Sequence, residues 1–253
     1  MSTILLTNDD GIQAPGLQAL YEELSTLGET WVIAPHEEKS ACGRSVTLSR
    51  PLRVSELSKR RLSVDGTPAD CVLLAFRSIL EEPPKIVVSG INHGFNVGED
   101  LDYSGTVAAA AEAALQGAQI SVAVSTDSKS DSSSLANSAK FTRALIEQLL
   151  EHPPPKGSYL NVNLPINQTK RIRWTRQGNP LGRGQVIVGN DPRGKQYYWI
   201  AERPNEDKPP ADTDRGAIED GCISLSVLTL DRNWQGDWTP PSLWSAGYSE
   251  EMP

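Results

Sequence analysis

The chain has 253 residues, of which 38% are hydrophobic, and its formal net charge at pH 7 is −8. A chain of this length can bury a core without disulfides, and its negative charge disfavours binding to a nucleic-acid duplex. The apolar run at residues 4–6 is too short for a signal peptide and no stretch is long enough to span a membrane, so we expect a cytoplasmic protein. Cys42, Cys71 and Cys222 are widely separated and form no CxxC pair, which indicates buried free thiols.

Apolar strands and helical stretches alternate along the first part of the chain. Residues 3–7 (TILLT) predict a short buried strand, and leucines at helical spacing from Pro15 onward predict the first helix. Thr67, Pro68 and Asp70 have the spacing of a helix start with a capping box. The other predicted elements are strands at 30–34, 85–89 and 120–125, a hairpin from 45–57 and 61–64, and helices at 104–117 and 134–152. This alternation predicts an α/β fold with a Rossmann-like, mostly parallel sheet and flanking helices.

The character of the chain changes near residue 165. Residues 159–164 (YLNVNL) still predict one more strand of the same sheet. Beyond it, the predicted strands alternate like those of hairpins and lie at 171–177, 185–188 and 196–201. Five of the six tryptophans also lie there. We therefore expect a Rossmann-like core at residues 1–165 and a C-terminal β-rich arm or swapped subdomain at residues 166–253.

Three polar loops each follow directly on a predicted buried strand. Asp9 and Asp10 follow the first strand, Ser40 lies in the loop after the second, and Asn92 follows the third. In an open parallel sheet the carboxyl ends of the strands lie along one edge, so these four side chains can converge. Carboxylate, hydroxyl and amide oxygens select Mg²⁺, Mn²⁺ or Ca²⁺ over zinc. Residues 8–11 also suit an ordinary turn, but two adjacent carboxylates repel each other unless a cation lies nearby.

A glycine-rich segment, residues 90–98, leads toward a helix that begins with Ser104, Gly105 and Thr106. Its glycines fall at every fourth position, which is not the GxGxxG pattern, so a dinucleotide site gains little support. Backbone amides, two hydroxyls and the helix dipole all favour an anion at such a helix start. Ser104 is also suited to cap the helix, and the two roles are compatible.

Together these segments resemble the SurE family, the survival-protein nucleotidases, over most of the first 125 residues. The matching motifs are residues 4–11, Ala34-Pro35 with Ser40 five residues on, residues 66–71, residues 89–92 with Asn96 and Gly98, and residues 103–107. The resemblance implies hydrolysis of nucleoside 5′-monophosphates, often of 3′-monophosphates, and in some members of short polyphosphate. It also implies one divalent cation, Mg²⁺ or Mn²⁺, per subunit, and a homodimer or homotetramer formed by exchange of C-terminal elements.

The resemblance also assigns the site residues. It implies that the metal ligands are Asp9, Asp10, Ser40 and Asn92. The residues that it places around the substrate phosphate are Asn96, Ser104, Gly105 and Thr106. We expect the two metal-binding acids, together with Asn96 and Ser104, to take part in catalysis. The chain departs from the family at Ala113, where a glycine is usual, and at residues 226–229, which lack a Thr-Pro; these differences concern the oligomer more than the chemistry.

The mechanism that we expect is metal-assisted hydrolysis of a phosphomonoester. The cation binds a phosphoryl oxygen and presents a water in line with the leaving oxygen, and Asp9 or Asp10 orients or deprotonates that water. Two covalent alternatives are attack by Ser40, for which no paired base is evident, and an aspartyl phosphate on Asp9, although such phosphatases space their acids by one residue. His93 is a candidate for protonating the leaving group. Two other classes stay open: a nucleotide-binding or stress-interaction protein with little turnover, and a metal-dependent glycosyltransferase that uses the carboxylates of residues 100–102.

Overall fold

The computed structural model describes residues 2–166, 171–179, 184–201 and 208–231. The strands are β1 (Thr3–Thr7), β2 (Glu29–Pro35), β3 (Val54–Ser58), β4 (Arg61–Val64), β5 (Ile86–His93), β6 (Ile120–Thr126), β7 (Ser158–Leu164), β8 (Ile172–Thr175), β9 (Gln185–Asn190), β10 (Gln196–Ala201) and β11 (Ile223–Thr229). The helices are α1 (Pro15–Leu24), α2 (Pro68–Leu74) with the π-helical turn η1 (Ala75–Ile79), α3 (Asp100–Tyr103), α4 (Gly105–Gln116), α5 (Ser132–Glu151) and α6 (Asp214–Glu219). Within these ranges, no helix combines the length and apolar character that a membrane span requires.

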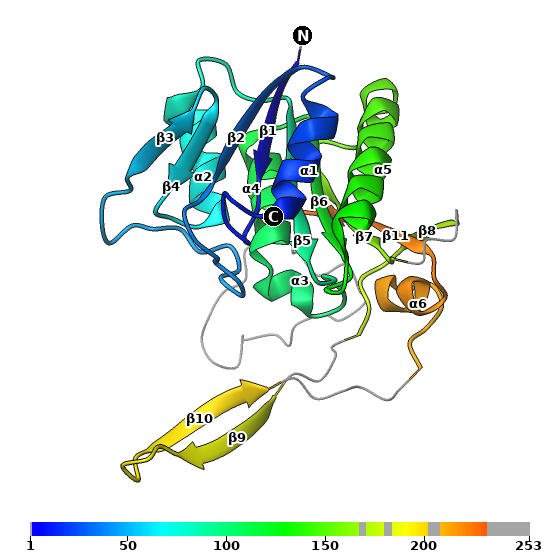
Figure 1. Ribbon diagram of the computed structural model, residues 1–253. Helices are drawn as coiled ribbons and strands as arrows, with labels where there is room; N and C mark the ends of the chain where they lie inside the picture. The colour runs from blue at the N-terminus through cyan, green and yellow to red at the C-terminus, as the bar shows by residue number, and fades with distance from the viewer. Residues whose placement is uncertain (1, 167–170, 180–183, 202–207, 232–253) are drawn as a thin grey trace, which may run out of the picture.

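Of the described strands, nine form one sheet in the order β3-β4-β2-β1-β5-β6-β7-β11-β8 (Figure 1). The neighbours from β4 to β7 run parallel, whereas β3 and β11 run antiparallel to β4 and β7. The order reverses between β1 and β5, because the chain adds β2 and β4 on one side of β1 and then β5, β6 and β7 on the other. A doubly wound sheet of this kind binds its ligand at the reversal, beyond the carboxyl ends of the strands. The predicted Rossmann-like fold is therefore confirmed.

Helices cover both faces of the sheet (Figure 1). On the face of α1 and α5, Ile4 and Leu6 of β1 enter a large apolar core together with Leu20 of α1. On the face of α2 and α4, Leu5 of β1 packs in a second core with Ala109 of α4. Successive side chains of a strand point to opposite faces, so a strand buried on both sides needs a continuous apolar run. Each leucine fully buried in this way stabilises the fold by about 1.5–3 kcal/mol relative to an exposed one.

The helix starts that frame the site are capped by side chains. The Thr67 hydroxyl accepts the Asp70 amide at 3.1 Å and the Asp70 carboxylate accepts the Thr67 amide at 2.9 Å, which confirms the predicted capping box of α2. Ser104 accepts the Val107 amide at 3.1 Å and so caps α4. At its other end α4 stops at Gly117, whose φ of +98° favours glycine. Both ends of α4 thus agree with the sequence prediction.

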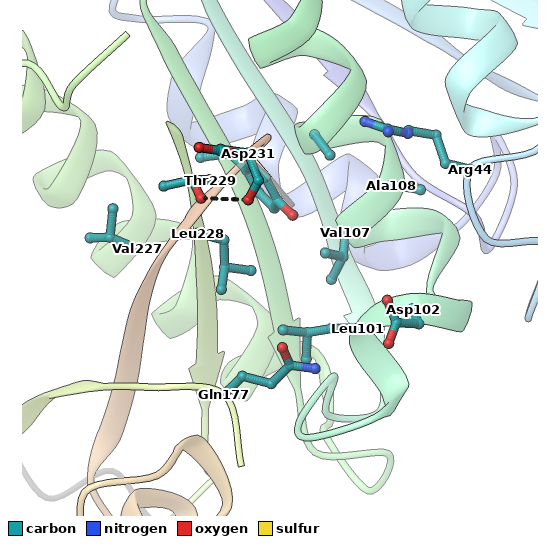
Figure 2. Close-up of a pocket in the computed structure, with 12 residues that line it drawn as sticks. Arg44, Leu101, Asp102, Val107, Ala108, Gln177, Val227, Leu228, Thr229 and Asp231 are labelled. Carbon is teal, nitrogen blue, oxygen red and sulfur yellow. Dashed lines mark hydrogen bonds between the residues drawn. The ribbon is translucent and has the colours of Figure 1, made fainter. Parts of the chain in front are cut away.

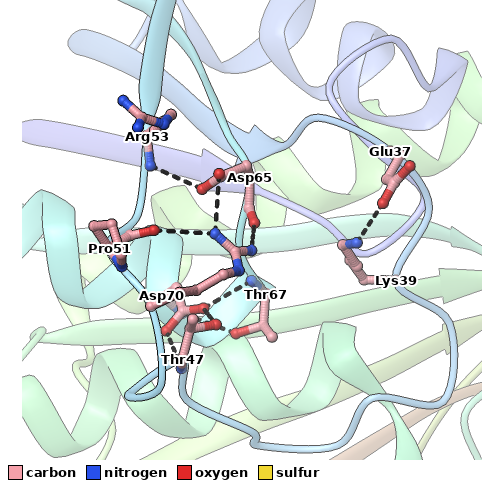
Figure 3. A network of polar contacts seen from close by, with 9 residues as sticks. Glu37, Lys39, Thr47, Pro51, Arg53, Asp65, Thr67 and Asp70 are labelled. Carbon is pink, nitrogen blue, oxygen red and sulfur yellow. Dashed lines mark hydrogen bonds and ion pairs between the residues drawn. The ribbon is translucent and has the colours of Figure 1, made fainter.

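The loop before β3 differs from the prediction. The hairpin strand predicted at 45–57 forms only at Val54–Ser58, which pairs with β4. The earlier part is held by side chains instead: the amide and the hydroxyl of Thr47 donate to the two carboxylate oxygens of Asp70, at 2.9 and 2.6 Å (Figure 3). Pro51 also lacks the amide hydrogen that a ladder would need. Side-chain contacts over a long sequence distance therefore replaced the expected strand pairing.

The sheet continues past residue 165. β7 joins it as predicted, and β11 and β8 then extend it further, with α6, which was not predicted, packed beside them. The predicted β-rich arm is present as the hairpin of β9 and β10, which lies apart from the body of the molecule (Figure 1). The division of the chain at residue 165 stays a prediction. Three elements from beyond that residue, β8, α6 and β11, belong to the main body.

Candidate active site

Loops at the carboxyl edge of the sheet surround a cavity of about 420 Å³ at the reversal between β1 and β5. Side chains reach it from the turn after β1, the loop after β2, the end of β5 with the loop that follows, and the start of α4. The predicted site residues that line it are Asp9, Asp10, Ser40, Asn92, Asn96 and Ser104. Gly105 and Thr106 lie directly behind it, against Asp9.

Asp9 is almost fully buried, with 4% of its surface exposed, and it contacts the start of α4. Its Oδ2 accepts the Thr106 amide at 3.0 Å, and its Oδ1 accepts the Thr106 hydroxyl. Gly105 makes room for this contact, because a Cβ at that position would lie 2.8 Å from the Asp9 Cβ. Burial raises the pKa of Asp9, and the hydrogen bonds from Thr106 oppose that rise. A nearby cation would keep this carboxylate ionised.

Asp10 contacts a different element, the end of β5, where its Oδ2 accepts the His93 amide at 3.3 Å. Burial raises the pKa of Asp10 to about 6, and the charge of Asp9 adds to the effect. After Asp10 the chain turns at Gly11, whose φ is +97°, and the Asn8 side-chain amide donates to the Gly11 carbonyl at 2.9 Å. This turn brings two side chains that leave the backbone in different directions to one cavity.

Ser40 reaches the cavity from the loop after β2. This loop is joined to the turn after β1, because the Lys39 amide donates to the Asp9 carbonyl at 2.7 Å. The exposed Ser40 hydroxyl donates to Glu38 Oε1 at 2.6 Å. Glu38 also lines the cavity, although its place in the sequence did not predict a role. A carboxylate two residues before a serine in a polar loop is a weak signal, which explains why sequence reasoning missed it.

The loop that carries Ser40 is tied to the capped start of α2. The Thr67 hydroxyl donates to the Ser45 carbonyl at 2.7 Å. The bonds between Thr47 and Asp70, which Figure 3 shows, add to this contact. Asp70 is 1% exposed, so its two bonds from Thr47 are partly shielded from water, whereas the bond between Thr67 and Ser45 is exposed. The motif that begins with Thr67 therefore supports the loop of Ser40 as well as starting a helix.

Asn92 and Asn96 lie on the glycine-rich segment at the end of β5. The Asn92 side-chain nitrogen donates to the Gly94 carbonyl at 2.7 Å, and its Oδ1 lies 3.5 Å from the hydroxyl oxygen of Thr106. Asn96 is buried, and its side-chain nitrogen donates to the Ser125 hydroxyl at 2.8 Å. Both amides thus line the cavity with hydrogen bonds that restrict their orientation.

The start of α4 contains the residues predicted to surround the phosphate. Ser104 lines the cavity, and because its oxygen accepts the Val107 amide, its hydroxyl proton can be donated into the cavity. Thr106 is fully buried, and its amide and hydroxyl are both donated to Asp9. A contact of Thr106 with phosphate stays a prediction. Its observed contacts show that it orients a predicted metal ligand.

The cavity is acidic. The carboxylates that line it are Asp9, Asp10, Glu38 and Asp100. No lysine or arginine is among the described residues that line it, so this set would repel a phosphate unless a cation neutralised it. Carboxylate, hydroxyl and amide oxygens suit a hard divalent cation such as Mg²⁺ or Mn²⁺. The described residues hold no metal-binding cluster of three or more His, Cys, Asp or Glu, so a metal here would also need the neutral oxygens of Ser40 and Asn92.

Comparison with known proteins shows the family to which this site belongs. The family described as "Survival protein SurE" matches residues 4–182. A protein named 5′-nucleotidase SurE from Pelobacter propionicus is 45% identical over 231 residues, which cover 90% of this chain and 93% of that protein. The chain belongs to the SurE family. The family resemblance predicted from the sequence motifs is therefore confirmed.

The SurE match also extends over the C-terminal segment. A 5′-nucleotidase SurE from Syntrophotalea carbinolica is 41% identical over 249 residues, which cover 97% of this chain and 98% of that protein. The crystal structure of the SurE protein from Aquifex aeolicus is 39% identical, with a TM-score of 0.80, and the match covers 91% of this chain and 94% of that chain. The similarity to SurE proteins thus covers most of the chain, including residues beyond 165.

A second pocket, of about 440 Å³, lies on the other side of α3 in this SurE chain (Figure 2). Asp102 lines it together with Leu101, Arg44 and Leu228, whereas Asp100 lines the active-site cavity. The two carboxylates therefore do not converge on one ligand. A metal-dependent glycosyltransferase site built from residues 100–102, the alternative raised by the sequence, has no support in the SurE geometry.

Proposed function

We propose that this chain is a metal-dependent 5′-nucleotidase, which hydrolyses nucleoside monophosphates to nucleoside and phosphate. The observation that carries the proposal is one cavity in which two carboxylates, a hydroxyl and two amides from separate loops meet the start of a helix. These oxygen donors suit a divalent cation, and the helix start suits a phosphate. The relatives from P. propionicus and S. carbinolica carry the name 5′-nucleotidase SurE, which supports the same activity.

The residues that would hold the cation, Mg²⁺ or Mn²⁺ at one per subunit, are Asp9, Asp10, Ser40 and Asn92. Two of these are carboxylates, so their combined charge of about −2 at neutral pH balances a divalent ion. When bound, the cation would neutralise phosphoryl charge and lower the pKa of a water molecule. Thr106 keeps the most buried ligand, Asp9, in one orientation through its two hydrogen bonds.

Asp10 is better placed than Asp9 to take a proton from the attacking water. Both oxygens of Asp9 accept hydrogen bonds from Thr106, whereas Asp10 accepts one, from the His93 amide, among the described residues. Asp10 therefore keeps lone pairs that a water molecule can use. We assign Asp10 as the proton acceptor in addition to its role as a ligand, and Asp9 as a ligand only. His93 lines the same cavity and stays a candidate donor for the leaving oxygen.

Ser104 and Asn96 are the groups that would contact the phosphate directly. The Ser104 hydroxyl can donate to a phosphoryl oxygen while it caps α4, and Asn96 retains one N–H beyond the bond to Ser125. Gly105 and Thr106 would act on the phosphate indirectly, because their backbone amides interact with Asp9. The positive end of the α4 dipole would favour the anion as well.

Of the two covalent alternatives, the contacts in the cavity disfavour one and leave the other open. An aspartyl phosphate on Asp9 is disfavoured, because this carboxylate is 4% exposed and both its oxygens accept hydrogen bonds. Attack by Ser40 gains a neighbouring base, because its hydroxyl donates to Glu38 at 2.6 Å. Ser40 therefore has two assignments, metal ligand or nucleophile, which a substitution can separate.

The decisive experiment is release of inorganic phosphate from AMP and GMP with added Mn²⁺ or Mg²⁺. We expect turnover with either metal, loss of turnover in the presence of a chelator, and recovery when metal is restored. Full activity in a metal-stripped, chelator-treated sample would refute the metal-dependent mechanism. Tight binding of AMP without phosphate release would instead support the other functional class, a nucleotide-binding protein.

We further propose a cytoplasmic homodimer or homotetramer in which a second copy of this chain covers the hairpin of β9 and β10. The apolar side chains of this hairpin are 44% to 83% exposed: Val186, Ile187, Val188, Tyr197, Tyr198, Trp199 and Ile200. An isolated two-stranded hairpin is marginal in water, and an apolar patch of this kind marks an interaction surface. A partner subunit would stabilise the hairpin by covering it.

A further inference from the structure

Strand β7 carries two asparagines in the interior of the sheet. Its side chains Leu160 and Val162 enter the apolar core under α1 and α5, whereas Asn161 and Asn163 alternate with them and point to the opposite face. Both asparagines are fully buried. Burial of an amide side chain costs free energy unless hydrogen bonds compensate for it. Their hydrogen-bond partners therefore indicate what these residues do.

Both asparagines bind the backbone of one residue, Asn96. Asn163 Oδ1 accepts the Asn96 amide at 2.9 Å, and Asn163 Nδ2 donates to the Asn96 carbonyl at 2.9 Å. Asn161 Nδ2 donates to the same carbonyl at 2.9 Å. A single side chain thus satisfies both backbone polar groups of Asn96, as a neighbouring strand would in a sheet.

This clamp also determines where the Asn96 side chain points. The peptide groups on both sides of Asn96 are held, and its side-chain nitrogen donates to Ser125 at 2.8 Å. Ser125 is the register partner of Asn163, so three contacts converge on the ends of β6 and β7. The glycines that flank this part of the loop, Gly94 and Gly98, have φ of +131° and +56° and allow many backbone conformations. Support from β7 selects one of them.

We propose that Asn163, assisted by Asn161, is a positioning residue that holds the phosphate-binding side chain of Asn96 in the cavity. The inference rests on the proposed function, in which Asn96 contacts the substrate phosphate. Among the described residues, neither asparagine of β7 lines the cavity, so each acts through Asn96 rather than on the substrate. Asn163 contributes more than Asn161, because it binds both backbone groups of Asn96.

A double-mutant cycle tests this assignment. Asn163→Asp keeps the acceptor for the Asn96 amide but turns an acceptor toward the Asn96 carbonyl, so kcat/KM for AMP should fall by about 10- to 100-fold. In the Asn96→Ala background the same substitution should cost less than about threefold, because the side chain to be positioned is absent. Asn163→Ser, which is neutral and smaller, repeats the cycle should the aspartate variant fail to fold. Thermal unfolding measures the stability of each variant.

Ser226→Ala is the matched control. Ser226 is fully buried on the neighbouring strand, in register with Asn161, and bonds to Thr175 rather than to Asn96. Its variant should lose stability but keep kcat/KM within about twofold. Two results would overturn the proposal. One is a loss of kcat/KM in Ser226→Ala as large as that in Asn163→Asp; the other is a loss from Asn163→Asp that is as large in the Asn96→Ala background as in the wild type.

A second readout separates this proposal from the proposed function. The affinity for inorganic phosphate in the presence of Mn²⁺, measured by calorimetry, gives the same cycle without turnover. Asn163→Asp should weaken phosphate binding in the presence of Asn96 and not in its absence. Absence of phosphate release from AMP would refute the 5′-nucleotidase, while the calorimetric cycle would still decide the role of Asn163.

Discussion

The turn after β1 and the loop after β5 form parts of the same cavity, but they depend on different parts of the chain. The turn is held by nearby contacts: the Asn8 side chain bonds to the Gly11 carbonyl three positions on, and the Asp9 carbonyl accepts an amide from the next loop. The loop after β5 is held by side chains from far along the chain, among them Asn163, 67 positions after Asn96. The backbone of the turn after β1 is therefore held by contacts close to it, whereas the backbone of the loop after β5 is held from far along the chain. The side chains of both acids in the turn still reach distant partners, because Asp9 accepts hydrogen bonds from Thr106 and Asp10 accepts the His93 amide.

The C-terminal segment also supports this second loop. Asp214 Oδ2 accepts the Gly98 amide at 2.9 Å, and Gln177 Nε2 donates to the Gly98 carbonyl at 2.8 Å. The other oxygen of Asp214 accepts the Gly178 amide at 3.0 Å, and burial raises the pKa of this carboxyl. The segment beyond residue 165, which is predicted to form the oligomer, thus also supports a loop of the candidate site. Substitutions in each region should separate metal binding from substrate binding.

The largest effect is expected in the turn after β1. Asp10→Asn removes the proton acceptor, so the rate of phosphate release should fall by about 10²- to 10⁴-fold and stay low at saturating Mn²⁺. Asp9→Asn should weaken metal binding, because a carboxylate binds a hard cation better than an amide does, but excess Mn²⁺ should recover much of the rate. Rates across a Mn²⁺ titration distinguish the two. Wild-type metal affinity in both variants would contradict the site assignment.

Ser40 is either a neutral metal ligand or a nucleophile. As a ligand, its substitution should reduce the rate less than substitution of either aspartate. As a neutral ligand, Ser40→Ala should weaken Mn²⁺ binding less than either aspartate variant, and excess metal should restore the rate. Glu38→Gln, which keeps an oxygen that can accept the Ser40 hydroxyl but removes the negative charge and the basicity, should leave the rate at saturating metal nearly unchanged. If both variants instead stay inactive at every metal concentration, Ser40 is the nucleophile and Glu38 its base.

Asp214→Ala removes a support of the loop after β5 that comes from α6, and it should change substrate binding but not metal binding. Loss of this carboxylate leaves the Gly98 and Gly178 amides without their acceptor, which should cost about 1–3 kcal/mol of stability and raise KM for AMP. Asp212→Ala is the control, because Asp212 is exposed and pairs with Arg176 at the surface. Calorimetry with Mn²⁺ should give wild-type affinity for both variants. A large loss of metal affinity in Asp214→Ala would show that the two parts of the site are not independent.

A substitution in the hairpin of β9 and β10 tests oligomer formation without changing the contacts that support the loop after β5. Trp199 is 67% exposed in the single chain, and Trp199→Asp places a charge at this position. A partner subunit that covers the position should therefore be released. Light scattering should show a smaller assembly, while kcat/KM per subunit changes little. Leu48→Asp, at an apolar residue that is 90% exposed outside the hairpin, serves as the control and should keep the wild-type assembly. An unchanged assembly in Trp199→Asp would place the interface elsewhere.

The smallest effect is expected at the start of α5, away from both loops. The Asp131 carboxylate accepts the Ser134 amide at 2.8 Å, and its hydrogen bonds lower the pKa of Asp131 to about 2 from the ordinary 3.8. A carboxyl whose pKa is lower in the folded state stabilises the fold above its unfolded pKa and loses that contribution as pH falls. The difference between wild type and Asp131→Ala in the free energy of unfolding, measured by urea titration, should therefore shrink as pH falls from about 4 to about 2. A difference that persists at pH 2 would show that the charge is not involved.

Local chemistry in the sequence was sufficient to predict β1, its turn and the start of α4. The run TILLT is apolar at every inner position because both faces of β1 are buried, and Asn-Asp-Asp-Gly favours a turn by its backbone preferences. Ser104 marks a helix start because its oxygen can accept an amide three residues on. These signals lie within a few residues of the feature that they predict, so a short sequence pattern includes every residue that determines it. The strand predicted before Val54 is wrong because a distant carboxylate, Asp70, binds its backbone instead.

Only the tertiary structure decided which distant side chains meet. Asn161 and Asn163 looked like alternate positions of a strand, and their partner Asn96 could not be read from that alternation. Glu38 was brought to line the same cavity as Asp9, and Asp100 and Asp102 were directed into different pockets, through the path of their loops. Such contacts depend on the direction of each side chain and on chain segments that pair across dozens of residues. Periodicity reports burial within one element, and it carries no information about which other element supplies the hydrogen-bond partner.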